Sequence, residues 1–290
     1  MSRNKSRLLS IESPFPDAHG MLRLLEPPDR CIETLWESLS EGTYDKPFIV
    51  DDGRRRSLHF DLDAVQSVMD LAAPDKLALA YTRKMMAFLL FNQAPGRILL
   101  LGLGGGSLAK FCYDRLPSTA LTAVEANADV IALREEFCIP ADDHRFRVIH
   151  SDGAAYLSTL TPCKDVILAD ACDRAGMAPQ LDSVEFYRDA RRCLNPGGVF
   201  VTNMCGNASS RIAHLVKLRN AFDDEFLTLP VRPSGNMIVF AFKERRPEVT
   251  WEHLETRATE LKRRFGLQFP RFVRRIALDV KLRRWQHVFG

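Results

Sequence analysis

Short apolar runs alternate with amphipathic stretches of helical period through the middle of the chain. Residues 97–101 form the clearest apolar run, and glycines end it, which is typical of a strand buried on both faces of a parallel sheet. Further strands are predicted at 121–125, 146–150, 165–169, 198–204, 225–231 and 236–242, and helices at about 74–91, 107–115, 128–137, 153–160, 184–193 and 209–222. This alternation predicts a parallel sheet with helices on both faces.

The last two predicted strands are connected differently from the others. Only residues 232–235 separate them, a link too short for the crossover that parallel strands require, so these two strands must pair antiparallel. We therefore expect an α/β fold with a doubly wound, mostly parallel seven-stranded sheet of the Rossmann-like methyltransferase type. Because dinucleotide dehydrogenases have a parallel sixth strand, this pattern favours a ligand of the S-adenosylmethionine type over NAD.

The N-terminal part of the chain has a different pattern. Residues 1–45 are rich in prolines and acids, with one short amphipathic stretch at 31–39, and we expect an extension that packs on the main domain or on a partner subunit. Two β-rich runs on either side of Asp52-Gly53 predict a hairpin. The basic residues 54–56 at its tip are expected to be solvated.

The C-terminal part is strongly basic. Apolar residues interleaved with Lys and Arg predict two helices, broken near Gly266 and Pro270, that dock on the core and keep a solvated basic face. The chain thus divides into an N-terminal extension and β-hairpin region (1–69), a catalytic domain (70–245) and a basic helical tail (246–290).

A glycine-rich turn follows the strand at 97–101. Glycine allows the backbone to turn sharply and to approach a ligand closely, and the free N–H groups of the next helix point back at the turn. Strand, turn and helix form a nucleotide-sized pocket at the carboxyl end of a strand. The glycines expected to bind the cofactor are Gly102, Gly104, Gly105 and Gly106.

The next predicted strand ends in an acid, Glu125, nineteen residues beyond Gly106. An acid at this place can accept hydrogen bonds from both hydroxyls of a ribose. The combination predicts a nucleoside site, and the alternative is a structural glycine turn beside a solvated Glu125.

Acids also follow the third and fourth predicted strands. Asp152-Gly153 comes after the third, where an acid can bind an adenine amino group, and Asp170 and Asp173 come after the fourth. A partly desolvated Asp170 at a strand end could take a proton from an amine. The alternative is that Asp170 caps the segment that follows it.

Composition narrows the class of protein. With 290 residues, 46% hydrophobic and 27% charged, the sequence is typical of a globular protein. No apolar stretch has membrane-spanning length and no signal peptide is evident, so we expect a cytoplasmic protein that has no membrane partner. The net charge of +3 is too small to indicate nucleic acid, and the seven scattered cysteines predict neither a disulfide framework nor a metal site.

Taken together, the motifs resemble those of the spermidine synthase (polyamine aminopropyltransferase) family, over about residues 48–243. The matching pieces are Leu62-Asp63-Ala64-Val65-Gln66, Tyr81, the glycine turn, Val124-Glu125, Asp152-Gly153, Asp170-x-x-Asp173 and Leu194-Asn195-Pro196-Gly197-Gly198. The resemblance implies an enzyme that uses decarboxylated S-adenosylmethionine as donor and an amine, putrescine in this family, as acceptor. It also implies that no metal is needed and that the chain forms a homodimer.

The same resemblance assigns roles to individual residues. Glu125 would hold the donor's ribose, Asp152 its adenine and Gln66 its nucleoside, with Gly153 beside Asp152. Asp170 would activate the acceptor amine, with Asp173 and Tyr81 completing the catalytic group.

Three departures from the family pattern indicate that the chain shares the family's fold but not its specificity for putrescine. Gly105 stands where the family has the acid that binds the donor's ammonium, Thr82-Arg83 replaces a His/Gln-Glu pair, and Arg174 replaces a proline. Like charges repel strongly in a cleft of low dielectric constant, so these changes disfavour a dicationic acceptor. Two other functions stay open: methyl transfer from intact S-adenosylmethionine to a small molecule, and nucleoside binding without catalysis.

Overall fold

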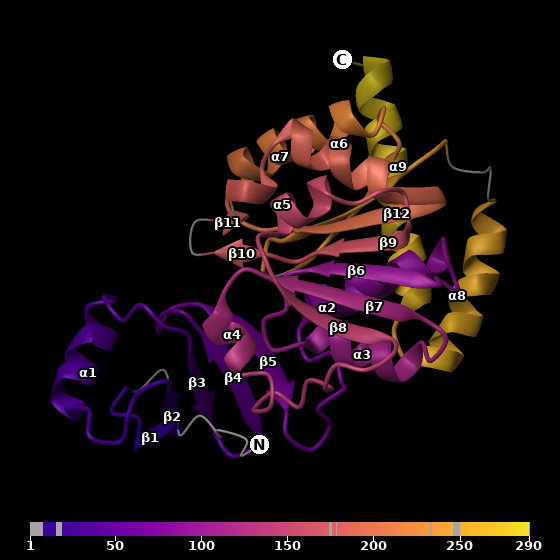
Figure 1. Ribbon diagram of the computed structural model, residues 1–290. Coiled ribbons are helices and arrows are strands. Elements are labelled where there is room, and N and C mark those ends of the chain that lie inside the picture. Colours follow the sequence, from indigo (N-terminus) through magenta and orange to yellow (C-terminus); the bar gives the residue numbers. More distant parts are fainter. Residues whose placement is uncertain are drawn as a thin grey trace.

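The computed structural model describes residues 8–15, 19–173, 176–177, 179–232, 234–245 and 250–289, with the backbone alone at 172–173, 176–177, 179 and 282–289. In these ranges, two large sheets with their helices and a two-stranded antiparallel sheet of short strands make up the fold (Figure 1). None of the helices in these ranges is both long enough and apolar enough to span a lipid bilayer.

The N-terminal sheet has five antiparallel strands in sequence order. They are β1 (Leu9–Glu12), β2 (Met21–Leu24), β3 (Phe48–Asp51), β4 (Arg55–His59) and β5 (Val65–Asp70). The amphipathic stretch at 31–39 forms α1 (Ile32–Ser40), which buries Leu35 and Leu39 against Leu22, Leu24 and Phe48. The predicted hairpin is present as β3 and β4. The extension before it is not merely packed on the domain, because it supplies two further strands.

The main sheet has seven strands in the order β13-β14-β12-β9-β6-β7-β8. Their bounds are β6 (Arg97–Leu101), β7 (Ala120–Glu125), β8 (Phe146–His150), β9 (Lys164–Ala169), β12 (Leu194–Met204), β13 (Phe226–Pro230) and β14 (Met237–Phe242). β14 runs antiparallel to both its neighbours, and the remaining pairs are parallel. The chain reverses its direction of travel across the sheet between β6 and β9, which is where such sheets bind ligands.

Helices cover both faces of this sheet (Figure 1). On one face lie α5 (Gly153–Ser158), α6 (Val184–Cys193) and α7 (Ala208–Ala221). On the other lie α2 (Ala80–Met85), the 3-10 helix η1 (Met86–Leu90), α3 (Ser107–Arg115), α4 (Ala128–Ala132), α8 (Trp251–Phe265) and α9 (Phe269–Phe289). The short elements β10 (Cys172–Asp173), β11 (Gly176–Met177) and η2 (Pro179–Leu181) lie between β9 and α6.

The helix predicted at 74–91 is shorter and split. Residues 74–79 form turns and extended backbone, held in part by Arg83, which donates a hydrogen bond to the Leu77 carbonyl at 2.8 Å. The all-apolar η1 that continues α2 is completely buried. The residues of η1 are apolar on every side of the helix, which is typical of a fully buried segment. The sequence pattern alone did not separate this segment from the apolar face of one longer amphipathic helix. The helix predicted at 128–137 likewise ends at Ala132.

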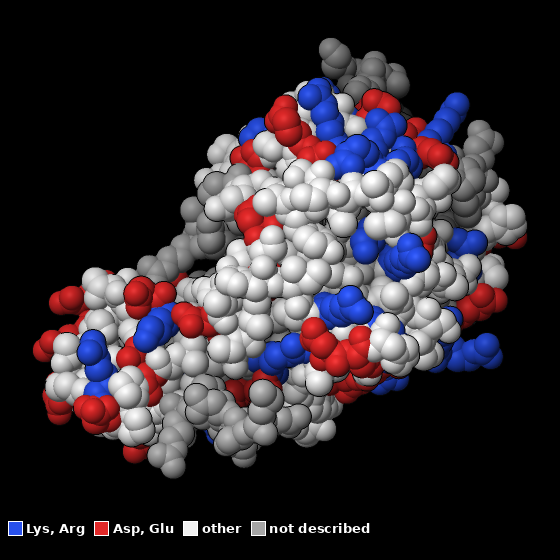
Figure 2. Space-filling view, in the orientation of Figure 1, with Lys and Arg blue, Asp and Glu red and all other residues white. Residues whose placement is uncertain are grey.

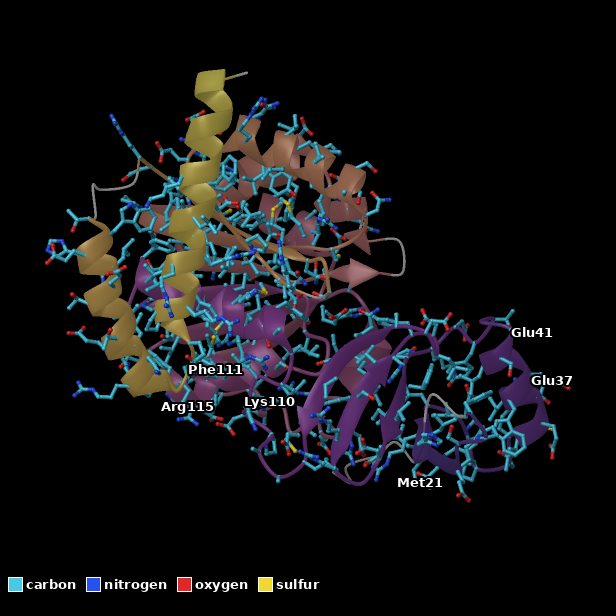
Figure 3. The ribbon with its side chains drawn as sticks, turned by 180° about the vertical axis from the view of Figure 1, so that it is seen from behind. Met21, Glu37, Glu41, Lys110, Phe111 and Arg115 are labelled. Atoms are coloured by element: carbon cyan, nitrogen blue, oxygen red, sulfur yellow. The ribbon has the colours of Figure 1, made fainter. Side chains whose placement is uncertain are left out.

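The tail docks on the core, as its apolar stripe predicted. Leu254, Ala258, Leu261 and Phe265 of α8 are buried in the same core as the sheet, and Gly266, with a φ of 72°, ends that helix. Seen from behind, α8 and α9 lie over the rear of the main sheet (Figure 3).

An ion-pair cluster joins the N-terminal sheet to the main domain. Arg56 pairs with Asp51 at 2.6 Å and with Glu136 at 3.0 Å, and Arg23 pairs with Glu136 at 2.7 Å. The prediction that residues 54–56 are all solvated is therefore wrong at Arg56, whose side chain is only 12% exposed. Arg54 and Arg55 are exposed. Tertiary packing brings Glu136 to the third arginine, and no local pattern shows it.

Candidate active site

A cavity of about 410 Å³ lies at the carboxyl ends of the parallel strands, beneath β5 of the N-terminal sheet. It brings together most of the residues expected from the sequence. Those that line it are Gln66, Tyr81, Gly102, Gly104, Glu125, Asp152, Gly153 and Asp170. Gly105 and Gly106 belong to the same turn but do not line the cavity. The side chain of Asp173, and most of the loop at 174–179, lie outside the described residues.

The glycine turn is required by close packing. A Cβ on Gly102, whose φ is +94°, would lie 2.3 Å from the backbone oxygen of Asp170. A Cβ on Gly106 would lie 2.4 Å from Ile139. At Gly104 it would meet nothing nearer than Ser67 at 3.9 Å, so this glycine leaves space on the cavity side of the turn.

Glu125, at the end of β7, stabilises the glycine turn through hydrogen bonds to its backbone. Its Oε2 accepts hydrogen bonds from the backbone N–H of Leu103 at 2.8 Å and of Gly104 at 3.5 Å, and its Oε1 accepts one from Asn127 at 2.9 Å. A carboxylate has about four lone-pair positions, so these bonds leave acceptor capacity for the hydroxyls of a ribose. Glu125 is therefore part of the turn and not a solvated side chain beside it.

Asp152 has a structural contact that the sequence analysis did not assign. It caps the N-terminus of α5, where its Oδ1 accepts a hydrogen bond from the backbone N–H of Ala155 at 2.8 Å. Asp152 also lines the cavity, and among the described residues no hydrogen bond to its Oδ2 is present. One carboxylate can thus cap the helix and still accept a bond from a ligand.

Asp170 follows β9 and does not act as a helix cap. Its Oδ1 accepts a hydrogen bond from Asn203 Nδ2 at 3.0 Å, and the hydroxyl of Tyr81 donates another to the carboxylate. Burial raises the pKa of Asp170 to about 6, although these two hydrogen bonds act to lower the pKa. Burial and the neighbouring Asp170 raise the pKa of Tyr81, which keeps its proton and stays a donor.

The sequence analysis missed the asparagines behind this group. Asn236, before β14, donates from Nδ2 to Asn203 Oδ1 at 3.0 Å, and Asn203 in turn donates to Asp170. The strand predicted at 198–204 would place Asn203 near its carboxyl end, beside the other site residues. The position of Asn203 near a strand end was the feature of the sequence that could have identified it as a site residue. Asn236 lies on the turn after β13, and no feature of the sequence identified it as a site residue.

Ser67 was also missed, and it bears on the Gly105 departure. A Cβ at Gly105 would lie 2.6 Å from Ser67 Oγ and 3.0 Å from Phe137. Ser67 Oγ is also 3.4 Å from Ser107 Oγ. The space that an acidic side chain at position 105 would need is thus occupied by a serine from the N-terminal sheet.

The side of the cavity formed by η2 is held in place by contacts with α7. Gln180 and Leu181 of η2 border the cavity, and Asp182 follows them. Its Oδ1 lies 2.6 Å from His214 Nδ1 and 2.8 Å from Lys217 Nζ, both on α7. These contacts hold η2 against the helix layer.

Cys205 also lines the cavity and is disulfide-bonded, whereas Cys31, Cys112, Cys138, Cys163 and Cys193 are free thiols. The sequence analysis expected no disulfide framework from the scattered cysteines, and the disulfide at Cys205 depends on tertiary contact, which cysteine spacing along the chain does not show. Among the described residues, no group of three His, Cys, Asp or Glu side chains is placed to hold a metal ion.

Comparison with known proteins places the chain in a family. The spermine/spermidine synthase domain model matches residues 78–252. The chain is 40% identical over 229 residues to a polyamine aminopropyltransferase of Chromobacterium violaceum, a match that covers 79% of this chain and 88% of the relative. A polyamine aminopropyltransferase of Neisseria meningitidis serogroup A is 38% identical over 227 residues, covering 78% and 86%.

Solved structures support the fold. A probable spermidine synthase from Corynebacterium glutamicum aligns with a TM-score of 0.63 at 22% identity, over 73% of this chain and 84% of that one. Human methyltransferase-like protein 13 aligns with a TM-score of 0.58 at 23% identity, over 65% and 93%. The expected methyltransferase-type fold is thereby confirmed. The relatives match most of the chain and are themselves matched over most of their length, so the chain belongs to the spermine/spermidine synthase family.

Proposed function

We propose that this protein transfers an aminopropyl group from decarboxylated S-adenosylmethionine to an amine. The observation that carries the proposal is the pairing of Asp170 with Tyr81 and Asn203 in the same cavity as the glycine turn and Glu125. The curated relatives are aminopropyltransferases by name, which supports the same reaction.

The nucleoside of the donor would lie over Gly104, where the turn leaves space. Glu125 would accept the ribose hydroxyls, Asp152 Oδ2 the adenine amino group, and Gln66 would contact the nucleoside from β5. The ribose and adenine contacts hold the donor in place, so that its reactive carbon faces Asp170. Alignment of this kind supplies much of the rate of a reaction between two bound molecules.

Asp170 would accept a proton from the acceptor amine. With its pKa at about 6, this carboxyl is ionised at neutral pH and can act as a general base. The amine nitrogen then attacks the carbon next to the sulfonium, a new C–N bond forms, and the C–S bond breaks. Its electron pair remains on sulfur, which leaves as an uncharged thioether. Tyr81 and Asn203 would orient the carboxylate throughout.

Methyl transfer from intact S-adenosylmethionine is the second candidate. It is favoured because neither Gly105, in the turn beside the cavity, nor Ser67, which lines the cavity, offers a carboxylate to repel the carboxylate of that donor.

Calorimetry with three nucleosides distinguishes these functions. We expect decarboxylated S-adenosylmethionine to bind more tightly than S-adenosylmethionine, with methylthioadenosine binding as well. Mass spectrometry of incubations with putrescine and longer amines should then detect one added aminopropyl group. Addition of a methyl group from intact S-adenosylmethionine would replace the proposal with the second candidate. Nucleoside binding without turnover of any amine would instead indicate a non-catalytic relative.

Two variants locate the binding. Glu125→Gln should weaken all three nucleosides, since a neutral amide accepts the ribose hydroxyls less well. Glu135→Gln, an exposed position outside the cavity, is the matched control and should bind normally. Equal affinities for the two variants would contradict the placement of the ribose.

A further inference from the structure

A second cavity of about 1170 Å³ opens on the rear of the molecule and shares no lining residue with the candidate active site. It lies between α2, the end of α3, the end of β13 and the junction of α8 with α9. Figure 3 shows Phe111 and Arg115, two of its lining residues, beside the lower ends of α8 and α9. We call it the rear groove.

The rear groove is lined by one sign of charge. Its basic residues are Lys76, Arg83, Lys84, Arg115, Arg232, Arg271, Arg274 and Arg275, against the single acid Asp75. Asp75 pairs with Arg115 at 2.9 Å, and Lys76 lies 4.0 Å from Asp70. Among the residues that the structure describes, no carboxylate lies within ion-pair distance of the other six. The face in Figure 2, by contrast, carries both signs interspersed.

Helix α9 divides its residues between the core and this groove. Phe272, Val273 and Ile276 are buried in the core. Arg271, Arg274 and Arg275, at the i, i+3 and i+4 positions of the helix, lie on one of its faces and line the groove. Three arginines on one helical face repel one another, so this arrangement costs stability unless an anion lies between them.

Two cations of α2 face these arginines and are held in place by backbone carbonyls. Lys84 Nζ donates to the Pro230 carbonyl at 2.6 Å, and Arg83 donates to the Leu77 carbonyl at 2.8 Å. Both side chains are half-buried. Burial lowers the pKa of Lys84, and the nearby charges of Arg275, Arg271 and Arg83 lower it further. Fixed, partly desolvated cations interact strongly with an anion.

We propose that the rear groove binds an oligophosphate, a chain of linked phosphates either free or carried by a nucleoside. Several closely spaced charges are needed to neutralise the six unpaired cations, and an oligophosphate supplies them in a compact form. An arginine guanidinium can bind two phosphate oxygens at once, and five of these six cations are arginines. They come from α9 (Arg271, Arg274, Arg275), the loop after β13 (Arg232) and α2 (Arg83). The concave shape and the mixed charge of the front face favour this ligand over a nucleic acid.

The test is calorimetric titration of the full chain with tripolyphosphate and with ATP at physiological salt. We expect saturable binding that weakens as salt is added, since the contacts are between charges. Arg271→Ala combined with Arg275→Ala should weaken tripolyphosphate binding at least about tenfold, because each charge-assisted bond is among the stronger hydrogen bonds. Lys262→Ala combined with Arg263→Ala removes the same charge from exposed positions of α8 outside the groove and should change nothing.

Each outcome bears on the proposal. Similar affinities for tripolyphosphate and ATP would show that the groove recognises the phosphate chain. Tighter binding of ATP would show that the ligand is a phosphate chain carried by a nucleoside. Absence of saturable binding by both, equal losses in the groove and control variants, or binding of single-stranded RNA alone would overturn it. Arg274→Glu, at an exposed position, is a second variant that should also weaken binding if the double variant fails to fold. None of these readouts depends on transferase activity.

Discussion

Asp170 is a carboxyl group whose surroundings oppose its charge. Burial raises its pKa to about 6, while the donors Asn203 and Tyr81 partly offset the effect. The balance leaves a carboxylate that is ionised at neutral pH, yet more basic than an exposed one. This is the condition under which a general base is most effective near pH 7.

The pH dependence of the reaction should report this balance. We expect kcat/KM to fall as pH drops through about 6, because the protonated Asp170 cannot accept a proton. Asn203→Ala removes a hydrogen bond that lowers the pKa of Asp170, so the acidic limb should move to higher pH. A pH–rate profile of both proteins measures the shift. An unmoved limb would show that another group controls the titration.

Asp170→Asn should separate chemistry from binding. We expect turnover to fall at least about a hundredfold, since the proposed general base is lost, while nucleoside affinity changes less than about twofold. Asp45→Asn, an exposed aspartate of the N-terminal region, is the control. Equal loss of turnover and affinity would show that Asp170 holds the site together instead.

The same substitution should affect stability in a pH-dependent way. The folded-state pKa of Asp170 lies above its ordinary value, so its stabilising contribution is complete at low pH and is lost as pH rises toward about 6. Asp170→Asn should therefore raise the melting temperature relative to the parent at pH 8 more than at pH 4. Thermal unfolding at the two pH values provides the measurement.

At the scale of elements, two short segments connect the parts of the site. The glycine turn joins β6 to α3 and passes beneath the end of β9. Strand β5 brings Gln66 and Ser67 from the other sheet over the same cavity. The ion-pair cluster around Arg56 sets where that sheet sits.

The turn requires glycine at position 102 for a steric reason. Gly102→Ala should lower the free energy of unfolding by more than about 2 kcal/mol, because a Cβ would collide with Asp170's backbone and the φ is positive. At Gly197, with a φ of +71° but nothing within 4 Å, alanine should cost about 1 kcal/mol. Urea unfolding compares the two. Equal losses would mean that the collision is relieved without cost.

Arg56 should matter where its neighbour in sequence does not. Arg56→Ala removes one of the two arginines that pair with Asp51 and Glu136 and leaves Arg23, 3.8 Å from Asp51 and 2.7 Å from Glu136. It should cost about 1 kcal/mol, whereas exposed Arg55→Ala should stay within about 0.5 kcal/mol. Although burial acts to raise the pKa of Asp51, hydrogen bonds from Arg56 and Gly53 lower it below its ordinary value. The difference between parent and Arg56→Ala should therefore shrink as acid protonates Asp51. Urea unfolding at two pH values tests both points.

The candidate active site and the rear groove are concave surfaces on separate parts of the molecule. The candidate active site lies at the strand ends between the two sheets, and the rear groove lies behind α2. Helix α2 carries Tyr81 to the first and Arg83 to the second, so one short helix borders both.

Assembly is a property of this scale. The family resemblance implies a homodimer, and among the described residues β1 is an edge strand of the N-terminal sheet, a position that favours association through backbone hydrogen bonds. Sedimentation should give twice the chain mass of 32.8 kDa. A single-chain mass at micromolar concentration would contradict this expectation.

The sequence by itself determined the sheet and the positions of the acids. Buried parallel strands are continuous apolar runs, so 97–101 and 165–169 were recognisable without any structure. Because such strands all end at one edge, Glu125 and Asp170 could be placed in one site. The short link expected at 232–235 likewise required the antiparallel pair that β13 and β14 form.

Only the tertiary structure decided which side chains meet across elements. The bonds from Asn203 and Tyr81 to Asp170, the place of Ser67 beside Gly105, and the pairing of Arg56 with Glu136 all join residues far apart in the chain. The rear groove is the same case, since α2, α9 and the end of β13 each contribute cations that look like ordinary surface charge in sequence. Local periodicity reports whether a residue is buried. It does not report which distant residue it is buried against, because packing of whole elements sets that.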